Sequence, residues 1–294
     1  MNGIIIVNKE KNLTSHDVVN RIRHVFNTRQ VGHLGTLDPI ATGVLVVCLN
    51  EATKLVPYLE NVTKEYVCEI SLGASTDTFD STGQITNKVD EFCVTEEIID
   101  DALHSFIGTS YQTPPKFSAI KINGKKLYEY ARRNEEVEVP TRKITIFEIE
   151  RISPLQLKNG YNTFKFRILV SKGTYIRSVC NDLGIKLGVP AHMSELTRTK
   201  NGEFKLANAW TLDDIEHGNY EIISMLDALK DYVFLTGSQF IQKAINGMKI
   251  SPIEVKKVVG YLPERIAIKD NNQLVAIYLL DLEKYCYKAG RVWK

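Results

Sequence analysis

At residues 32–45 the chain reads Gly-His-Leu-Gly-Thr-Leu-Asp-Pro-Ile-Ala-Thr-Gly-Val-Leu, between a helical pattern that ends near Asn27 and an apolar run that ends at Leu49. Glycine reaches backbone angles that are closed to other residues. Pro39 pushes Asp38 towards an extended conformation. The stretch therefore predicts a sharply turned loop that leads into a buried strand.

Asp38 is the only carboxylate of this loop, and two interpretations of it are open. In one, Asp38 caps a one-turn helix that begins at Pro39, an arrangement worth about 1 kcal/mol. In the other, the loop presents Asp38 to a substrate, because functional carboxylates often lie on loops braced by rigid elements. Local sequence favours the cap, so the choice depends on the rest of the chain.

The composition is that of a globular protein. A chain of 294 residues with 44% hydrophobic content is long enough for one large domain and a small one. No apolar run approaches the roughly 20 residues that span a bilayer, and no signal-peptide pattern is present, so we expect a cytoplasmic protein. The spacing of the five cysteines and six histidines argues against a disulfide framework and against a protein-bound metal.

Charge divides the chain near Leu235. Residues 236–294 hold ten Lys or Arg against five Asp or Glu, a net +5 in a chain of net +2, so residues 1–235 carry −3. Such an asymmetry is typical of a basic module that contacts phosphates, although basic clusters are also often just solvated surface. We therefore expect a large domain at 1–235 and a small basic domain at 236–294.

Hydrophobic periodicity predicts helices and strands throughout the large domain. Thr14 and Asp17 resemble a capping box at the start of a helix, and Gly188 is a typical helix stop. The expected strands are 4–7, 44–49, 64–73, 144–152 and 163–171, and the expected later helices are 95–106 and 176–187. This pattern predicts an α+β domain.

Two polar segments carry candidate functional side chains. Residues 76–83 contain Asp77 and Asp80, which either cap turns through their own backbone or form a second carboxylate pair. Residues 116–133 hold six basic residues against one acidic residue, interleaved with aromatic rings. That mixture suits a surface that binds a phosphate backbone and offers stacking faces, although the rings can equally pack against the body.

A third segment, residues 172–177, is a strand-to-helix turn that sets Tyr175 beside Arg177. Both side chains can face a cleft. In the alternative interpretation, Tyr175 belongs to the core and Arg177 pairs with a carboxylate such as Asp182. The residues alone leave this choice open.

These segments recur in the order found in a known family. The loop 32–45, Asn8-Lys9, Lys64-x-Tyr66 and the segments 76–83, 118–132 and 172–177 together resemble the bacterial tRNA pseudouridine-55 synthases of the TruB type. The resemblance covers roughly residues 3–215. It implies a pseudouridine-synthase fold, with a large mixed, mostly antiparallel sheet, flanking helices and a central cleft, followed by a small β-rich PUA-like RNA-binding domain.

The resemblance implies that uridine 55 in the T-loop of tRNA is isomerised to pseudouridine without a cofactor or metal. Asp38 matches the position of the catalytic carboxylate, and Arg177 matches the arginine that pairs with it. The expected substrate-contacting residues are His33, Tyr66, Tyr175, Leu196, Lys9 and Lys121. On this basis Asp38 is a catalyst rather than a cap.

The implied chemistry suits these residue types. Breaking the C1′–N1 bond builds positive charge on the sugar, and Asp38 can either bond to C1′ or help form a glycal by removing a C2′ proton. Tyr66 and Tyr175 offer walls and Leu196 a floor for the detached base. His33 is placed to fill the space that the extruded base leaves. Tyr66 is our candidate for removing the C5 proton, although a neutral phenol is a weak base at pH 7.

Two other functions remain open from the sequence. An RNA N-glycosidase would use Asp38 with Asp77 or Asp80 and release free base, whereas a non-catalytic RNA-binding or folding module would need only the basic segments. Relatives that act within guide-RNA particles share the loop. This chain has no obvious additional interaction segments, so we expect a stand-alone monomer that binds the T-arm of tRNA.

Overall fold

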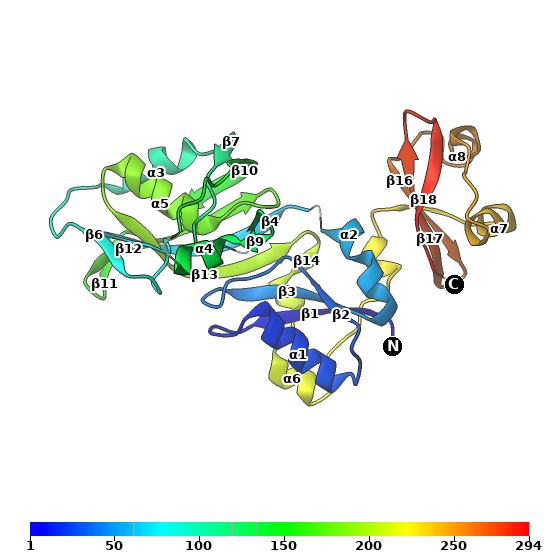
Figure 1. Ribbon diagram of the computed structural model, residues 1–294, viewed down its shortest axis with the longest axis horizontal. Helices are drawn as coiled ribbons and strands as arrows, with labels where there is room; N and C mark the ends of the chain where they lie inside the picture. Colours follow the sequence, from blue (N-terminus) through cyan, green and yellow to red (C-terminus); the bar gives the residue numbers. More distant parts are fainter. Residues whose placement is uncertain (61, 119, 134, 294) are drawn as a thin grey trace.

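The structure is a computed structural model, and it describes residues 1–60, 62–118, 120–133 and 135–293. A large body with helices around a ten-stranded sheet carries a smaller lobe, built on a separate four-stranded sheet, at the C-terminal end (Figure 1). This arrangement confirms the expected fold class. Among the described residues, no helix is long and apolar enough to cross a membrane.

The large sheet runs in the order β1-β3-β13-β4-β12-β10-β7, and only the β3–β13 pair along this path is parallel. These strands are β1 (Gly3–Lys9), β3 (Thr42–Leu49), β13 (Ala191–Asn201), β4 (Lys64–Leu72), β12 (Tyr161–Val170), β10 (Arg142–Arg151) and β7 (Gly108–Gln112). Three short strands extend it: β2 (Val31–Leu34), β11 (Gln156–Lys158) and β14 (Phe204–Lys205). The hairpins β5 (Ala74–Thr76) with β6 (Ile85–Lys88) and β8 (Lys121–Ile122) with β9 (Lys125–Lys126) lie outside it.

The body's helices begin and end largely where their local signals predict. Thr14 and Asp17 form the complete capping box of α1, Thr95 caps α3, and Gly188 closes α5 in the left-handed conformation. The helices are α1 (Ser15–Val25), α2 (Val56–Leu59), α3 (Glu96–His104), α4 (Leu127–Arg132), α5 (Ile176–Leu187) and α6 (Leu212–Glu216). Helix α3 packs on α5 and β10, and α5 packs on β13.

The two faces of the central strands have opposite character, because alternate residues of a strand point to opposite faces. On one face, Phe164 and Phe166 of β12 are fully buried, each worth about 1.5–3 kcal/mol of burial. On the other face, Glu65 of β4 accepts hydrogen bonds from Arg167 and Lys200. The apolar face is where the body's core and the candidate site are found.

The C-terminal lobe packs on the short helix α2 and the 3-10 turn before it. Trp293 and Ile277 share an apolar cluster with Leu55 and Leu59, and Trp293 Nε1 donates to the carbonyl of Glu51 at 3.3 Å. The lobe holds β15 (Val233–Leu235), β16 (Arg265–Asp270), β17 (Gln273–Asp281), β18 (Cys286–Val292), α7 (Ser238–Ile245) and α8 (Pro252–Val259). Its sheet therefore starts at β15, just before the charge boundary at 236.

Candidate active site

The backbone of the glycine-rich loop accepts and donates hydrogen bonds that define its turn. Arg198 Nη2 donates to the carbonyl of Gly35 at 2.9 Å, and the N–H of Ala41 donates to the carbonyl of Asp38 at 3.0 Å. The second bond closes a turn, and no helix begins at Pro39. The interpretation of Asp38 as a helix cap is therefore wrong.

Gly43 explains why the loop must return close to β13. Its φ is +96°, and a Cβ on it would lie 2.3 Å from the carbonyl oxygen of Arg198. A larger residue would therefore force β3 and β13 apart. The parallel contact of these two strands anchors the end of the loop.

The loop brings Asp38 to Arg177, in the first turn of α5. Arg177 Nε lies 2.9 Å from Oδ2 of Asp38, but its N–H does not point along a hydrogen bond, so the contact is an ion pair. The guanidinium is fixed by two carbonyls, because Nη1 donates to Thr78 at 3.1 Å and Nη2 donates to Phe117 at 3.0 Å. The Arg177 side chain is 5% exposed and that of Asp38 is 37% exposed. The carboxylate of Asp38 is thus accessible to solvent on one side and contacts the buried guanidinium of Arg177 on the other.

Asp80 is a second carboxylate on the same guanidinium. Its Oδ2 lies 3.6 Å from Nη1 of Arg177, and its Oδ1 accepts from Thr78 Oγ1 at 2.8 Å and from the N–H of Thr82 at 2.9 Å. The interpretation as a turn cap is therefore correct for Asp80, whose other oxygen contacts Arg177, although Asp80 is not among the residues that line the Asp38 cavity. Among the described residues, the partner of the Asp77 carboxylate is the backbone N–H of Gln84 in the same turn. Our sequence-based list of site residues did not include Asp80.

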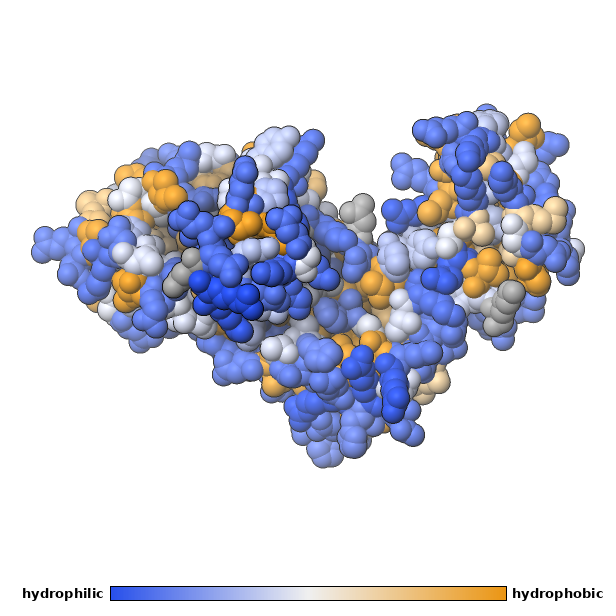
Figure 2. Space-filling view, viewed as in Figure 1, coloured by the Kyte–Doolittle hydropathy of each residue, from blue (hydrophilic) through white to orange (hydrophobic). Residues whose placement is uncertain are grey.

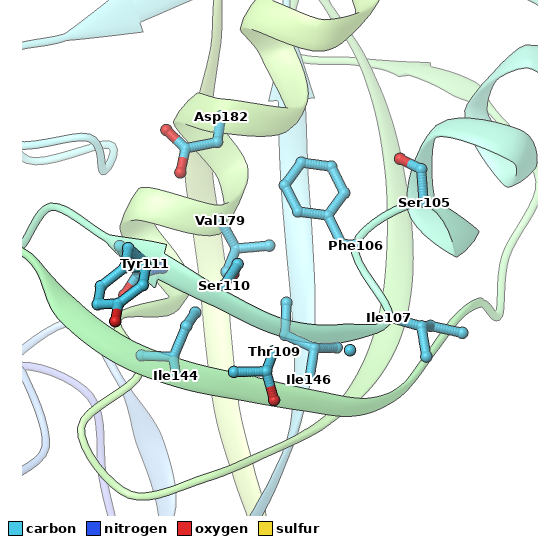
Figure 3. Close-up of a pocket in the computed structure, with 12 residues that line it drawn as sticks. Ser105, Phe106, Ile107, Thr109, Ser110, Tyr111, Ile144, Ile146, Val179 and Asp182 are labelled. Atoms are coloured by element: carbon cyan, nitrogen blue, oxygen red, sulfur yellow. The ribbon is translucent and has the colours of Figure 1, made fainter.

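Asp182 is not the partner of Arg177. It lies farther along α5 and lines a different cavity, of about 280 Å³, beside β7 and β10 (Figure 3). Its hydrogen-bond partner in the described chain is the amide of Asn181, at 3.3 Å. Burial raises the pKa of Asp182. The alternative of a structural Arg177–Asp182 pair is therefore wrong.

The environment of Asp38 sets its acidity through opposing effects. Burial raises the pKa of Asp38 above its ordinary value, Arg177 opposes this rise, and the negative charge of Asp80 adds to it. Ionisation of Asp38 therefore depends on Arg177. We therefore expect the pKa of Asp38 to rise further when Arg177 is removed.

Asp38 and Arg177 line a cavity of about 430 Å³ together with three of the expected base-contacting residues. Tyr66 of β4 and Leu196 of β13 are each 7% exposed on neighbouring strands. The third is Tyr175, whose backbone N–H and carbonyl are both held by the side-chain amide of Gln112, at 2.8 and 3.1 Å. The arrangement offers aromatic and apolar walls beside a carboxylate.

Three other expected residues are not among those that line this cavity. His33 lies in β2, where burial lowers its pKa and its Nδ1 has no hydrogen-bond partner among the described residues. Lys9 has no exposed surface, and its Nζ donates to the carbonyls of Glu10, Leu13 and Pro39. Lys121 is exposed in β8. The structure thus places Lys9 beneath the loop and Lys121 on the surface.

Basic residues that sequence reasoning missed also line the cavity. Lys64 and Arg198 are buried, and Arg142 and Lys172 are more exposed. Lys64 had a usable signal, because it stands two residues before Tyr66 in a strand and shares its face. Within the described residues, no group of three or more His, Cys, Asp or Glu is arranged to hold a metal ion.

Comparison with protein families gives two adjacent matches. Residues 23–176 match the N-terminal domain of the TruB family pseudouridylate synthases, and residues 177–233 match the C-terminal domain of tRNA pseudouridylate synthase B. The two matches meet between Ile176 and Arg177, so the Asp38–Arg177 pair joins the two matched segments. The basic lobe beyond residue 233 lies outside both matches.

Individual proteins agree with this result. The chain is 50% identical over 216 residues to tRNA pseudouridine synthase B of Bacillus pumilus, covering 73% of this chain and 70% of that protein. It is 40% identical over 289 residues to the protein of the same name from Staphylococcus saprophyticus, covering 94% of each. Among solved structures, a Cbf5-Nop10-Gar1 complex contains a chain that is 27% identical, with a TM-score of 0.71 over 99% of this chain and 84% of that one.

Proposed function

The chain belongs to the TruB family of pseudouridylate synthases, and from this membership we propose that it isomerises uridine 55 in the T-loop of tRNA to pseudouridine. The observation that carries the proposal is the Asp38–Arg177 ion pair inside a cavity walled by Tyr66, Tyr175 and Leu196. An isomerase of this kind needs one carboxylate at the sugar and a pocket that retains the detached base.

In the proposed reaction the C1′–N1 bond breaks and a C1′–C5 bond forms. N1 gains a proton and C5 loses one. Asp38 acts at C1′ or at C2′, and Arg177 holds it ionised and oriented. Tyr66 and Tyr175 keep the base in place while it turns, and the hydroxyl of Tyr66 relays the C5 proton to water, giving up its own proton as it accepts the one from C5. Lys9, which donates to the carbonyl of Pro39, is assigned to positioning the loop rather than to RNA contact.

The substrate must reach this cavity as an extruded nucleotide. Extrusion from a folded loop costs a few kcal/mol, and His33, upstream on the loop, is proposed to fill the vacated space. Lys121 and the other basic residues of the segment 116–133 are proposed to hold the T-arm. The protein is proposed to act in the cytoplasm as a monomer without a guide RNA.

The experiment that tests this function uses tRNA labelled with tritium at C5 of uridine. Isomerisation releases the label as water and leaves the mass of the RNA unchanged, and the modified position then maps to the T-loop. An N-glycosidase would instead release free uracil. A protein that only binds RNA would release neither.

We expect the basic lobe to supply phosphate contacts. Lys256 and Lys257 of α8 are exposed, on the side of the lobe that lies away from the body in Figure 1, and the surface between the lobe and the body is indented (Figure 2). Replacing both with Gln should weaken tRNA binding at low salt. For each phosphate that the double variant no longer neutralises, the slope of log affinity against log salt should flatten by about 0.9.

Charge neutralisation is a cleaner test than deleting the lobe, because deletion would expose the apolar cluster of Leu55, Leu59 and Trp293. The matched control is Lys230→Gln, which removes an exposed lysine paired with Glu203 outside the lobe's sheet. A double variant with the wild-type salt slope would contradict an RNA contact at α8.

A further inference from the structure

Among the described residues, the body buries four lysine or arginine side chains, and three of them have acceptors in the protein. Lys9 donates to three carbonyls, and Arg177 donates to two and pairs with Asp38. Arg198 donates to the carbonyl of Val44 at 2.7 Å and to that of Gly35 at 2.9 Å. These contacts are what burial of a cation normally requires.

Lys64 is the exception among the described residues. It is 9% exposed and lines the Asp38 cavity, yet its Nζ has no hydrogen-bond acceptor and no carboxylate at ion-pair distance in the described chain. Glu60, the carboxylate whose charge bears on it, is instead paired with Lys172 at 2.8 Å. The ammonium lies against the glycine-rich loop, since a Cβ built on Gly35 would be 3.3 Å from both Cε and Nζ of Lys64.

We propose that Lys64 binds a backbone phosphate adjoining the flipped nucleotide, and so forms a phosphate subsite inside the catalytic cavity. This inference rests on the proposed function, because it takes the cavity's ligand to be an extruded nucleotide of RNA. A phosphate supplies the acceptor that the protein withholds from Lys64, and a charge-assisted contact of this kind is strong in a buried site.

The position of Lys64 along β4 suits this role. Lys64 and Tyr66 are alternate residues on one face of the strand, about 6.6 Å apart along it. A base held against Tyr66, with its ribose at Asp38, leaves its phosphate directed along the cavity wall. Arg142 and Lys172 line the same cavity and add positive charge near the subsite.

The electrostatics around Lys64 favour binding of an anion. Burial, together with the nearby cations Arg198 and Lys172, lowers the pKa of Lys64 to about 8, and Glu60 opposes this lowering. A bound phosphate would favour the charged form. Binding of RNA at pH 8.5 should therefore take up a fraction of a proton, measurable by calorimetry in buffers of different ionisation enthalpy.

The decisive experiment is a thermodynamic cycle between one side chain and one phosphate. T-arm stem-loop RNAs carry a neutral methylphosphonate on the 5′ or the 3′ side of the target uridine. The nucleotide before the linkage is 2′-deoxy, as it is in the charged control RNA. We expect one of the two neutral RNAs to bind wild-type protein about 10- to 100-fold more weakly than its control.

Lys64→Met should bind the charged RNA more weakly than wild type by the same factor. Its affinity for the neutral RNA should equal that of wild type for the neutral RNA. Lys64→Arg should restore most of the affinity, because it restores the charge. Lys200→Met, a lysine on the opposite face of the sheet, is the matched control and should stay within about twofold of wild type. Lys64→Met should be at least as stable to heat as wild type, because it removes a buried, unpaired charge.

Each outcome decides one question. The phosphate subsite would be overturned if wild type bound all the RNAs with equal affinity. It would also be overturned if the losses of binding free energy caused by Lys64→Met and by the methylphosphonate were additive. Full affinity with lost turnover in both Lys64 variants would also overturn it, and would make Lys64 a proton-transfer group. If Lys64 and the phosphate are coupled in binding as expected but wild type releases no tritium from the T-loop, the proposed function fails while the phosphate subsite stands.

Discussion

Asp38→Asn is expected to lower kcat for tRNA isomerisation by at least about 10⁴-fold while leaving tRNA affinity unchanged or slightly raised. The amide keeps the shape of the side chain and can no longer bond to C1′ or remove a C2′ proton. The turn that carries residue 38 is held through backbone groups, so its geometry should survive. Single-turnover tritium release gives kcat, and filter binding gives affinity.

Asp77→Asn is the matched control. Asp77 lies in the turn that also holds Asp80. Its partner within the described chain is the backbone N–H of Gln84, from which the asparagine oxygen can still accept a hydrogen bond. We expect turnover within about threefold of wild type, as for most surface changes. Isomerisation retained in Asp38→Asn would remove Asp38 from the mechanism.

The second large effect is expected at Arg177. Arg177→Met removes the charge that opposes the raised pKa of Asp38, so that pKa rises further and the acid limb of the pH–rate profile moves to higher pH. We expect kcat at neutral pH to fall by about 10²- to 10³-fold. The substitution also leaves the carbonyls of Thr78 and Phe117 and the buried carboxylate of Asp80 without their cationic partner, so folding must be checked by thermal unfolding.

Asp80→Asn should shift the pKa of Asp38 in the opposite direction. Its negative charge raises the pKa of Asp38, so its removal should move the acid limb to lower pH. Arg177→Lys keeps the charge but loses the two-pronged hold on the carbonyls of Thr78 and Phe117, and should recover part of the rate. Acid limbs that move in the same direction in Arg177→Met and Asp80→Asn would contradict this electrostatic account.

Sequence reasoning succeeded where a structure depends on neighbouring residues. The capping box of Thr14 and Asp17, the cap at Thr95 and the stop at Gly188 were predicted because each involves groups within one or two helical turns. Strand alternation likewise placed β4 and β12, since the period of two is local. The order of motifs then identified the family.

Local sequence did not identify the partners of the charged residues. It favoured Asp38 as a helix cap and left Asp182 as a partner for Arg177, yet the structure pairs Arg177 with Asp38 and Asp80. The motif Lys64-x-Tyr66 was recognised, but no role was predicted for Lys64, and the substrate contact predicted for Lys9 stays a prediction. The cost of a buried charge depends on which acceptors the fold brings to it, and spacing along the chain does not contain that information.

The sequence by itself determined the elements, their caps and the family, because these depend on short-range chemistry and on motif order. Only the tertiary structure decided which carboxylate meets Arg177, which lysine is satisfied and which faces the cavity. The reason is the strand order β3-β13-β4-β12, which brings together residues that are far apart in sequence. The loop that begins at Gly32 becomes a site only when β13 and α5 close around it.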